Sequence, residues 1–243
     1  MIAVIWRRRV LALGCLLYAA QPGCGLTRLQ TARTVARGQT QTTVAASVLH
    51  TSDRGFGNGV PLVPLDLMVR HGATDRVDWG VRLFLGTGAL GDVKWNLLAP
   101  ERRTAIALST GFGAAYTGRG AGESSSTPQP SGATLHVPVI ISASHAVLPW
   151  FTPYAAVGYG AYWIVGYGQR DPARSYAPRS GTGDGLLTLH AGVELARASG
   201  RALLLEYTYA RPVVSDPGDS YEFAVDQFIS IAFHTGRGSA FER

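Results

Sequence analysis

The sequence predicts an all-β protein: a closed, antiparallel, up-and-down transmembrane β-barrel of about ten strands. From Thr40 onward, about ten short segments alternate apolar and polar residues, the period of a strand with two different faces. The connections between these segments alternate in length, as in barrels with long outer loops and tight inner turns. Only 16% of the residues are charged, yet the sequence has no run of 18 apolar residues that could form a membrane helix.

The first 23 residues are typical of a secretory signal peptide. Three arginines at 7–9 precede the apolar run 10–20, which is too short to cross a bilayer as a helix. The end of the signal has two interpretations. Cys24, between two glycines, is a candidate lipoprotein junction at which it becomes the lipidated first residue, and plain cleavage after Ala20 is the alternative.

Composition excludes several classes of protein. The two cysteines are Cys15 and Cys24, so the rest of the chain has neither a disulfide scaffold nor a Cys-ligated metal site. Removing residues 1–23 takes away three arginines and no acid, which lowers the formal net charge from +6 to +3. After the signal there is no basic cluster interleaved with aromatic residues, so we expect no nucleic-acid partner. No motif predicts a metal or a cofactor.

We expect a signal peptide at 1–23, a polar periplasmic N-terminal leader at 24–38 and a barrel at 39–243. The predicted strands are 40–50, 61–71, 76–86, 88–98, 103–116, 133–145, 150–168, 185–197, 201–211 and 223–234. The predicted tight links are 72–75, 99–102, 146–149 and 198–200, and the longer links are 51–60, 117–132, 169–184 and 212–222. An even number of strands places the N- and C-termini on the same, periplasmic, side.

The segment 103–116 indicates which face meets lipid. Alternate positions from Ala105 to Gly113 carry small residues, whereas Ile106 and Phe112 face the other way. A row of small residues suits the crowded lumen of a narrow barrel. The apolar face therefore points outward, and its members include Leu83, Leu189 and Ile229. Aromatic residues near both ends of the strands predict two interfacial belts.

Prolines at 64, 138 and 153 fall inside predicted strands. A closed barrel has no free edge to accommodate a residue without an N–H group. Pro153 lies near a strand start and is easily tolerated. Pro64 and Pro138 predict bulges or local breaks, and if either ends a strand the number of strands falls to eight.

Three stretches resemble a known family. Leu29–Thr34 (LQTART), followed by Gly38-Gln39, resembles the opening of small, largely uncharacterised bacterial outer-membrane barrel proteins, many with a lipoprotein-type signal. His71–Val81 (HGATDRVDWGV) is similar to their hairpin turn. Gln227–Phe233 (QFISIAF) resembles the aromatic-ended last strand that the barrel assembly machinery reads, although ten residues follow it here. The resemblance implies an outer-membrane location, with membrane lipid and that machinery as partners, and it implies no reaction.

Polar residues on the inward face predict a charged network in the lumen. Its members are Asp66, Arg70, Asp78, Arg82, Asp92, Lys94, His190, Glu194, Glu206 and Asp226. A turn centred at Thr87 places Asp92 across from Arg82, with Lys94 diagonal to Asp78. The structural interpretation is that this network fills and rigidifies a narrow barrel, and the functional one is a selectivity site for a small polar solute.

The first hairpin sets the register of the network. A turn centred in 72–75 places Arg70 directly opposite Asp78, and Asp66 directly opposite Arg82. One register thus satisfies both pairs, and opposite charges that face each other across two strands stabilise the sheet.

Three functions remain open. The first is an outer-membrane barrel with a narrow polar lumen, porin-like in fold, with a structural or small-solute transport role. The second is a membrane-embedded hydrolase acting on lipid or lipopolysaccharide, with His190 near Thr208 and Glu206 on the next strand. The third is a soluble secreted β-barrel that binds an apolar ligand. We expect the first, since no motif carries a specific reaction.

Overall fold

The computed structural model describes residues 27–51, 65–85, 88–117, 131–167, 184–197, 200–213 and 226–236. These residues form ten strands: β1 (Thr40–Thr51), β2 (Leu65–Gly72), β3 (Val77–Phe84), β4 (Gly88–Asn96), β5 (Thr104–Thr117), β6 (Ser131–His145), β7 (Phe151–Tyr167), β8 (Asp184–Arg197), β9 (Arg201–Val213) and β10 (Asp226–Thr235). Among the described residues, no helix is long and apolar enough to cross a membrane. The predicted signal peptide and Cys24 lie outside the described residues.

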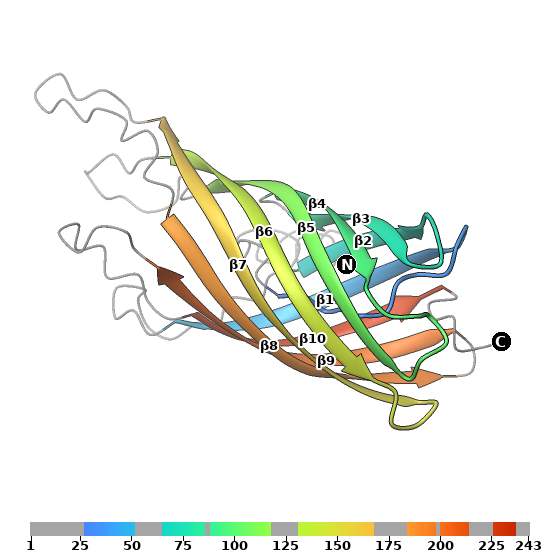
Figure 1. The fold of residues 1–243 in the computed structure, drawn as a ribbon. Coiled ribbons are helices and arrows are strands. Elements are labelled where there is room, and N and C mark those ends of the chain that lie inside the picture. The colour runs from blue at the N-terminus through green and yellow to red at the C-terminus, as the bar shows by residue number, and fades with distance from the viewer. Residues whose placement is uncertain are drawn as a thin grey trace, which may run out of the picture.

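Each strand pairs antiparallel with its neighbours in sequence, and β1 pairs with β10 to close the barrel (Figure 1). The closing pair runs from Thr42 opposite Thr235 to Thr51 opposite Asp226. Closure leaves no strand edge without a partner, so every strand satisfies its backbone groups within the wall. The predicted fold class, a closed antiparallel barrel of ten strands, is confirmed.

The short connections gather at one rim of the barrel. Those at 73–76, 97–103 and 146–150 lie close to the predicted tight links, and β8 ends and β9 begins at the same rim, with Arg197 opposite Arg201. β1 begins and β10 ends at this same rim, which is the end that carries the C label in Figure 1. We call it the tight-turn rim.

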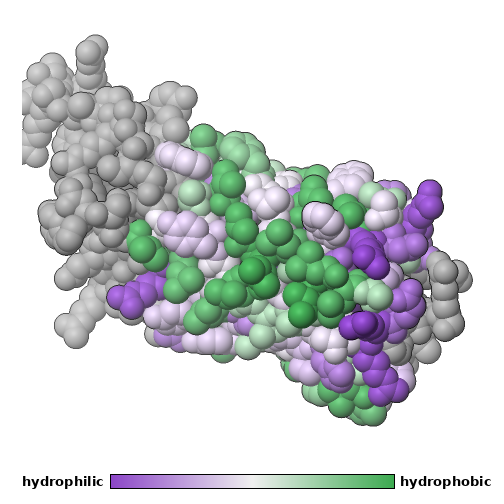
Figure 2. Space-filling view, in the orientation of Figure 1, coloured by the Kyte–Doolittle hydropathy of each residue, from purple (hydrophilic) through white to green (hydrophobic). Residues whose placement is uncertain are grey.

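The two faces of the wall differ as the alternation predicts. On β5, Ala105, Ala107 and Ser109 are buried in the lumen, whereas Phe112 is 56% exposed on the outside. Each strand presents at least one exposed large apolar side chain, for example Val44, Val69, Leu83, Val93, Phe112, Ile141, Val157, Leu189, Leu205 and Ile229. Figure 2 shows this hydrophobic surface across the middle of one face, with hydrophilic residues toward the tight-turn rim.

Pro138 lies inside β6 and pairs with Gly160 of β7. On its other side, the pairing of β5 with β6 skips from Thr110–Val139 to Gly113–His136. The register is the same on both sides of the gap, so the ladder is broken locally and has no bulge. Pro138 therefore does not end the strand. Pro64 lies outside the described residues.

The N-terminal segment is where the structure departs from the expectation of a periplasmic leader. Residues 27–36, called here the inserted segment, run inside the barrel. Buried residues of this segment are Thr27, Arg28, Leu29, Gln30, Thr31, Ala32, Thr34 and Val35. Gly38, at φ +72°, lies where the chain leaves the lumen at the tight-turn rim, and its N–H donates to the carbonyl of Gly72.

The lumen accepts this segment because its wall carries small residues. Ala32 packs with Ala105 and Ala107 of β5 in one buried cluster. Leu29 packs in a second cluster whose members include Tyr154, Leu204, Ala45 and Ala232. The core of this protein is therefore the interface between the inserted segment and the inner face of the wall.

Candidate functional site

The predicted lumen residues do face inward. Asp66, Arg70, Asp78, Arg82, Lys94, His190 and Glu206 are buried, Asp92 is 10% exposed at its side chain, and Glu194 is half-buried on the same face of β8 as His190. They form two groups, one on β2–β4 and one on β8–β9. The side chain of Asp226 is not among those described.

The register of β2 against β3 differs from the predicted one by two positions. Arg70 lies opposite Gly80, and Gly72 lies opposite Asp78. The turn 73–76 is the cause. It has the predicted length but lies one residue further along the chain, where Thr74 Oγ1 accepts hydrogen bonds from the backbone N–H groups of Arg76 and Val77. The prediction that Arg70 and Asp78 are directly opposed is therefore wrong.

The predicted ion pairs nevertheless form, as diagonal contacts. Arg70 binds Asp78, with an Nε to Oδ1 distance of 3.0 Å, and Arg82 binds Asp66. Long arginine side chains reach diagonal neighbours across strands, so a shift of two positions preserves these contacts.

Two further predicted contacts are corrected. Asp92 binds Arg70 and not Arg82: Nη1 of Arg70 lies 2.8 Å from each carboxylate oxygen of Asp92. Lys94 is directly opposite Asp78 and not diagonal to it, with an Nζ to Oδ2 distance of 3.4 Å. Both differences follow from the register of β3 against β4, which differs from the predicted one by two positions, with Asp92 opposite Gly80.

Glu206 organises the second group. Its carboxylate accepts hydrogen bonds from the hydroxyls of Tyr154, at 3.0 Å, and Thr208, at 2.9 Å. Nδ1 of His190 lies 3.4 Å from Glu206 Oε1 and 3.1 Å from Thr208 Oγ1. The sequence predicts His190 near Thr208 and Glu206, and the structure brings these three residues together. Tyr154 is not part of that prediction, since a tyrosine on a strand carries no signal of its own.

Both groups bind the main chain of the inserted segment. The two oxygens of Glu206 accept the backbone N–H groups of Arg28, at 2.6 Å, and Leu29, at 2.7 Å. Leu29 adopts φ +50°, a left-handed conformation that is uncommon for a leucine. The carboxylate thus holds a sharp bend of the chain in the middle of the lumen.

The β2–β4 group holds the segment at three further points. Asp78 Oδ2 accepts the N–H of Val35 at 2.8 Å. Lys94 Nζ donates to Gln30 Oε1 and to the carbonyl of Thr31, at 3.2 and 3.3 Å. The guanidinium of Arg82 donates to the carbonyl and hydroxyl oxygens of Thr27. The charged network therefore binds a peptide segment as well as pairing with itself.

The contacts of His190 also resemble in part those of a catalytic histidine. Its Nε2 lies 3.1 Å from Thr188 Oγ1, so a hydroxyl, an imidazole and a carboxylate stand in line. Two features weaken this arrangement as a catalytic triad. Glu206 already accepts hydrogen bonds from two backbone amides and two hydroxyls, and the hydroxyl that meets His190 is a buried threonine on its own strand. Ser230, another candidate, bonds to Ser47 at 2.7 Å.

The sequence matches no family model and no curated protein. Similar solved structures include the attachment invasion locus protein Ail of Yersinia pestis, at 11% identity and a TM-score of 0.36, covering 82% of this chain and 99% of that one. An outer membrane channel from Pseudomonas putida F1 is 10% identical with a TM-score of 0.42, covering 89% and 99%. Neisserial surface protein A is 8% identical with a TM-score of 0.39, covering 81% and 95%. At these identities and scores, the similarities assign no activity to this chain.

Proposed function

We propose that this protein is a bacterial outer-membrane β-barrel with a structural role, whose narrow polar lumen is closed by its own N-terminal segment. The exposed apolar ring on all ten described strands supports the membrane location. Trp79, Trp95 and Trp150 are about half exposed near the tight-turn rim, where an interfacial belt is expected. The start of β1 and the end of β10 are proposed to face the periplasm, since tight turns face the periplasm in such barrels; the inserted segment itself runs from this rim into the lumen.

A soluble barrel that binds an apolar ligand requires the opposite arrangement, with apolar residues inside and polar residues outside. Here the buried residues of the lumen include Arg70, Asp78, Lys94 and Glu206, while leucines, valines and isoleucines cover the outside. Sedimentation tests the location directly. We expect the protein in the outer-membrane fraction and released by detergent, and recovery in the soluble periplasmic fraction would contradict the proposal.

The observation that carries the proposed role is the attachment of the inserted segment to both sides of the lumen. Glu206 of β9 holds one end, at Arg28 and Leu29, and Asp78 of β3 holds the other, at Val35, while Lys94 of β4 binds Gln30 and Thr31 between them. A segment held in this way blocks the path of a solute, so passage requires the segment to leave. The proposed resting state is therefore a closed barrel and not an open pore.

Conductance in planar bilayers tests the closed state. We expect the wild-type protein to conduct little, and a variant that lacks residues 27–36 to conduct more, because the deletion empties the lumen. Glu101→Gln, an exposed change in a tight turn, is the control for non-specific effects of mutation. Equal conductance of the wild type and the deletion variant would show that the segment does not close the lumen.

The barrel assembly machinery is the proposed partner during biogenesis. β10 ends the described barrel and presents Ile229, Ile231 and Phe233 outward, as the last strand that this machinery reads is expected to do. Replacement of Phe233 by Ser is expected to slow insertion in vivo more than replacement of Phe112, which is also exposed but lies on β5.

A hydrolase acting on lipid or lipopolysaccharide is the alternative, favoured only by the contact of His190 with Thr188. Release of fatty acid from phospholipid or lipopolysaccharide by the wild type, and its loss in His190→Ala, would support it. Activity that persists in His190→Ala would contradict a catalytic role of His190.

A further inference from the structure

One side chain of the inserted segment is a buried cation without an ionic partner. Arg28 is 3% exposed, and the lone side-chain hydrogen bond that the described residues provide joins its Nη2 to Ser109 Oγ at 3.0 Å. Within the described part of the chain, no carboxylate oxygen lies within 4 Å of its guanidinium, and its Nε has no hydrogen-bond partner. An arginine guanidinium stays protonated at pH 7, so Arg28 is a buried positive charge.

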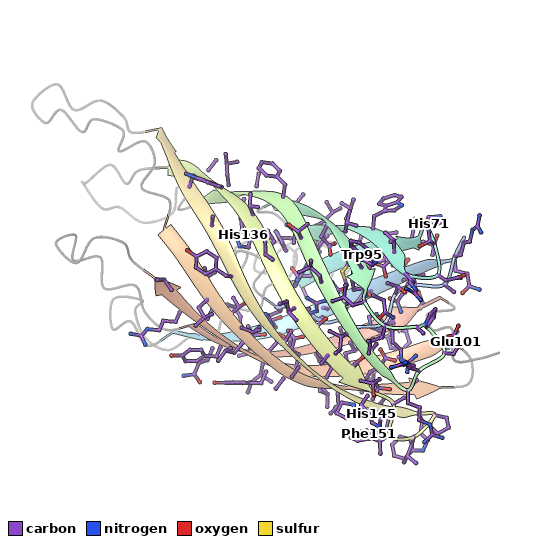
Figure 3. The ribbon with its side chains drawn as sticks, in the orientation of Figure 1. His71, Trp95, Glu101, His136, His145 and Phe151 are labelled. Carbon is purple, nitrogen blue, oxygen red and sulfur yellow. The ribbon has the colours of Figure 1, made fainter. Side chains whose placement is uncertain are left out.

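A second nitrogen without a partner belongs to the same region. Nε2 of His136, on β6, is buried and meets no hydrogen-bond partner among the described residues. Figure 3 shows His136 toward the end of the barrel opposite to Glu101 and His145, away from the tight-turn rim. Gly160 of β7 leaves the space for this ring, since a Cβ there would lie 2.1 Å from Nε2.

Both side chains line one cavity of about 40 Å³, next to the buried end of the inserted segment. Its charged lining residues are Arg28, Arg82 and Asp92, two cations against one carboxylate. Asp92, whose oxygens already accept hydrogen bonds from Arg70, and Glu206 both attract Arg28 from beyond ion-pair distance, so no described carboxylate is in contact with its guanidinium. Ser109 and Thr188 add hydroxyl groups to the lining.

A buried guanidinium without a counter-charge is costly, because desolvation of an ion is offset only by pairing and hydrogen bonds. A neutral histidine with its proton on Nε2 donates a hydrogen bond without adding charge. We infer that this cavity is a binding site for one small monovalent anion, held by Nε of Arg28 and Nε2 of His136. This inference does not depend on whether the barrel conducts.

The size of the cavity limits the ligand. A water molecule needs roughly 10–15 Å³ of cavity volume, so the cavity of about 40 Å³ has room for about three non-hydrogen atoms. Chloride, bromide and formate fit this limit, whereas gluconate is too large. The two atoms without a described partner, Nε of Arg28 and Nε2 of His136, are the donors that favour an anion over a cation.

Thermal unfolding of the purified full-length protein in detergent tests the site. At constant ionic strength, replacement of gluconate by chloride is expected to raise the melting temperature saturably, because a ligand that binds only the folded state stabilises it. Arg28→Gln is expected to weaken the apparent chloride affinity by about tenfold or more, the worth of one charge-assisted hydrogen bond. His136→Phe is expected to weaken it less, since it removes a neutral donor.

Arg33→Gln is the matched control. Arg33 lies on the same segment, but its Nη2 donates to the carbonyls of Arg102 and Arg103 near the tight-turn rim, and it does not line the cavity. This variant is expected to keep the chloride response. An identical response in Arg28→Gln and Arg33→Gln would overturn the site, because the effect would then be one of general ion binding.

Crystals of the wild-type protein in sodium bromide provide a measurement that does not require any variant to fold. An anomalous peak between Arg28 and His136 is expected. Water alone in the cavity, together with equal melting temperatures in chloride and gluconate, would overturn the inference and show that the orphan nitrogens are merely hydrated.

Discussion

Arg70 of β2 and Asp92 of β4 are joined across the strand that separates them, with Nη1 of Arg70 2.8 Å from both carboxylate oxygens. The side chain passes over Gly80 of β3. A Cβ at Gly80 would lie 2.9 Å from both Cγ and Nη1 of Arg70, closer than side chains approach one another. Gly80 is therefore the position that allows the bridge.

Gly80→Ala is expected to destabilise the barrel by roughly 1–3 kcal/mol, the range for inserting a methyl group into a packed interior. Gly91→Ala is the matched control, since a Cβ there meets nothing within 4 Å. Denaturant unfolding in detergent measures both changes. Equal stability of the two variants would mean that Arg70 does not pass over Gly80.

Arg70→Ala is expected to destabilise the barrel more than Arg82→Ala. Among the described residues, Arg70 pairs with Asp78 and Asp92, whereas Arg82 pairs with Asp66. Arg70→Ala therefore breaks two ion pairs and Arg82→Ala one, although Asp78 keeps Lys94. Removing one partner of a buried ion pair costs about 3–5 kcal/mol, because the other charge stays buried. The predicted register implied the reverse order, since it assigned Asp92 to Arg82. Unfolding of the two single variants therefore distinguishes the observed register from the predicted one.

Glu206→Gln is expected to loosen the inserted segment, because one oxygen that accepts a backbone N–H is replaced by an amide donor. The probe is a cysteine at Thr31, a buried position, in a Cys24→Ser background. Its labelling by a maleimide is expected to rise by about tenfold or more, since each hydrogen bond to a charged group contributes about 1.5–3 kcal/mol.

The control for this labelling experiment is Glu101→Gln, which changes the same residue type at an exposed turn. Labelling at Thr31→Cys should stay as slow as in the parent protein. Rapid labelling in the parent itself would mean that the segment leaves the lumen without any mutation.

Leu189→Arg is expected to cost on the order of 2–4 kcal/mol, as for a cation at the bilayer midplane on the lipid face of a barrel. Leu189 is 46% exposed in the middle of β8. Leu148→Arg, at a similarly exposed position in a tight turn, is expected to cost about 0–1 kcal/mol near the interface. Unfolding from lipid vesicles gives both values, and a well-tolerated Leu189→Arg would place that face outside the bilayer.

Lipidation of Cys24 conflicts with an inserted segment. Thr27 is bound to Arg82, five residues along β3 from Val77 at the rim, about 16 Å of strand and roughly 13 Å along the axis of a tilted barrel. Three residues reach at most about 11 Å, so we predict that Cys24 is not anchored in the periplasmic leaflet while Thr27 stays bound. We therefore expect cleavage after Ala20.

Metabolic labelling with palmitate tests this expectation. Neither the wild type nor Cys24→Ser should incorporate label, and the mature N-terminus should begin at Gln21. Label that enters the wild type and is lost in Cys24→Ser would show that the lipidated protein keeps its N-terminal segment outside the lumen.

The number of strands and the orientation of their faces follow from local sequence. A strand repeats every two residues, so the parity of Leu83, Leu189 and Ile229 already places them on one face of the wall. The small residues of β5 mark the lumen for the same reason. These features need no knowledge of what lies across the barrel, which is why sequence alone determines them.

The alternation of polar and apolar residues does not determine which charged residues form ion pairs inside the lumen. Parity puts Arg70, Asp78 and Asp92 in the lumen, but a hydroxyl in a turn, that of Thr74, decides which of them meet. The position of the inserted segment is likewise decided by tertiary structure. The polar residues of the segment suit water and a polar lumen equally well. Only the assembled wall makes the interior the more favourable place, because Glu206 and Asp78 bind the segment there and the alanines of β5 leave space for it.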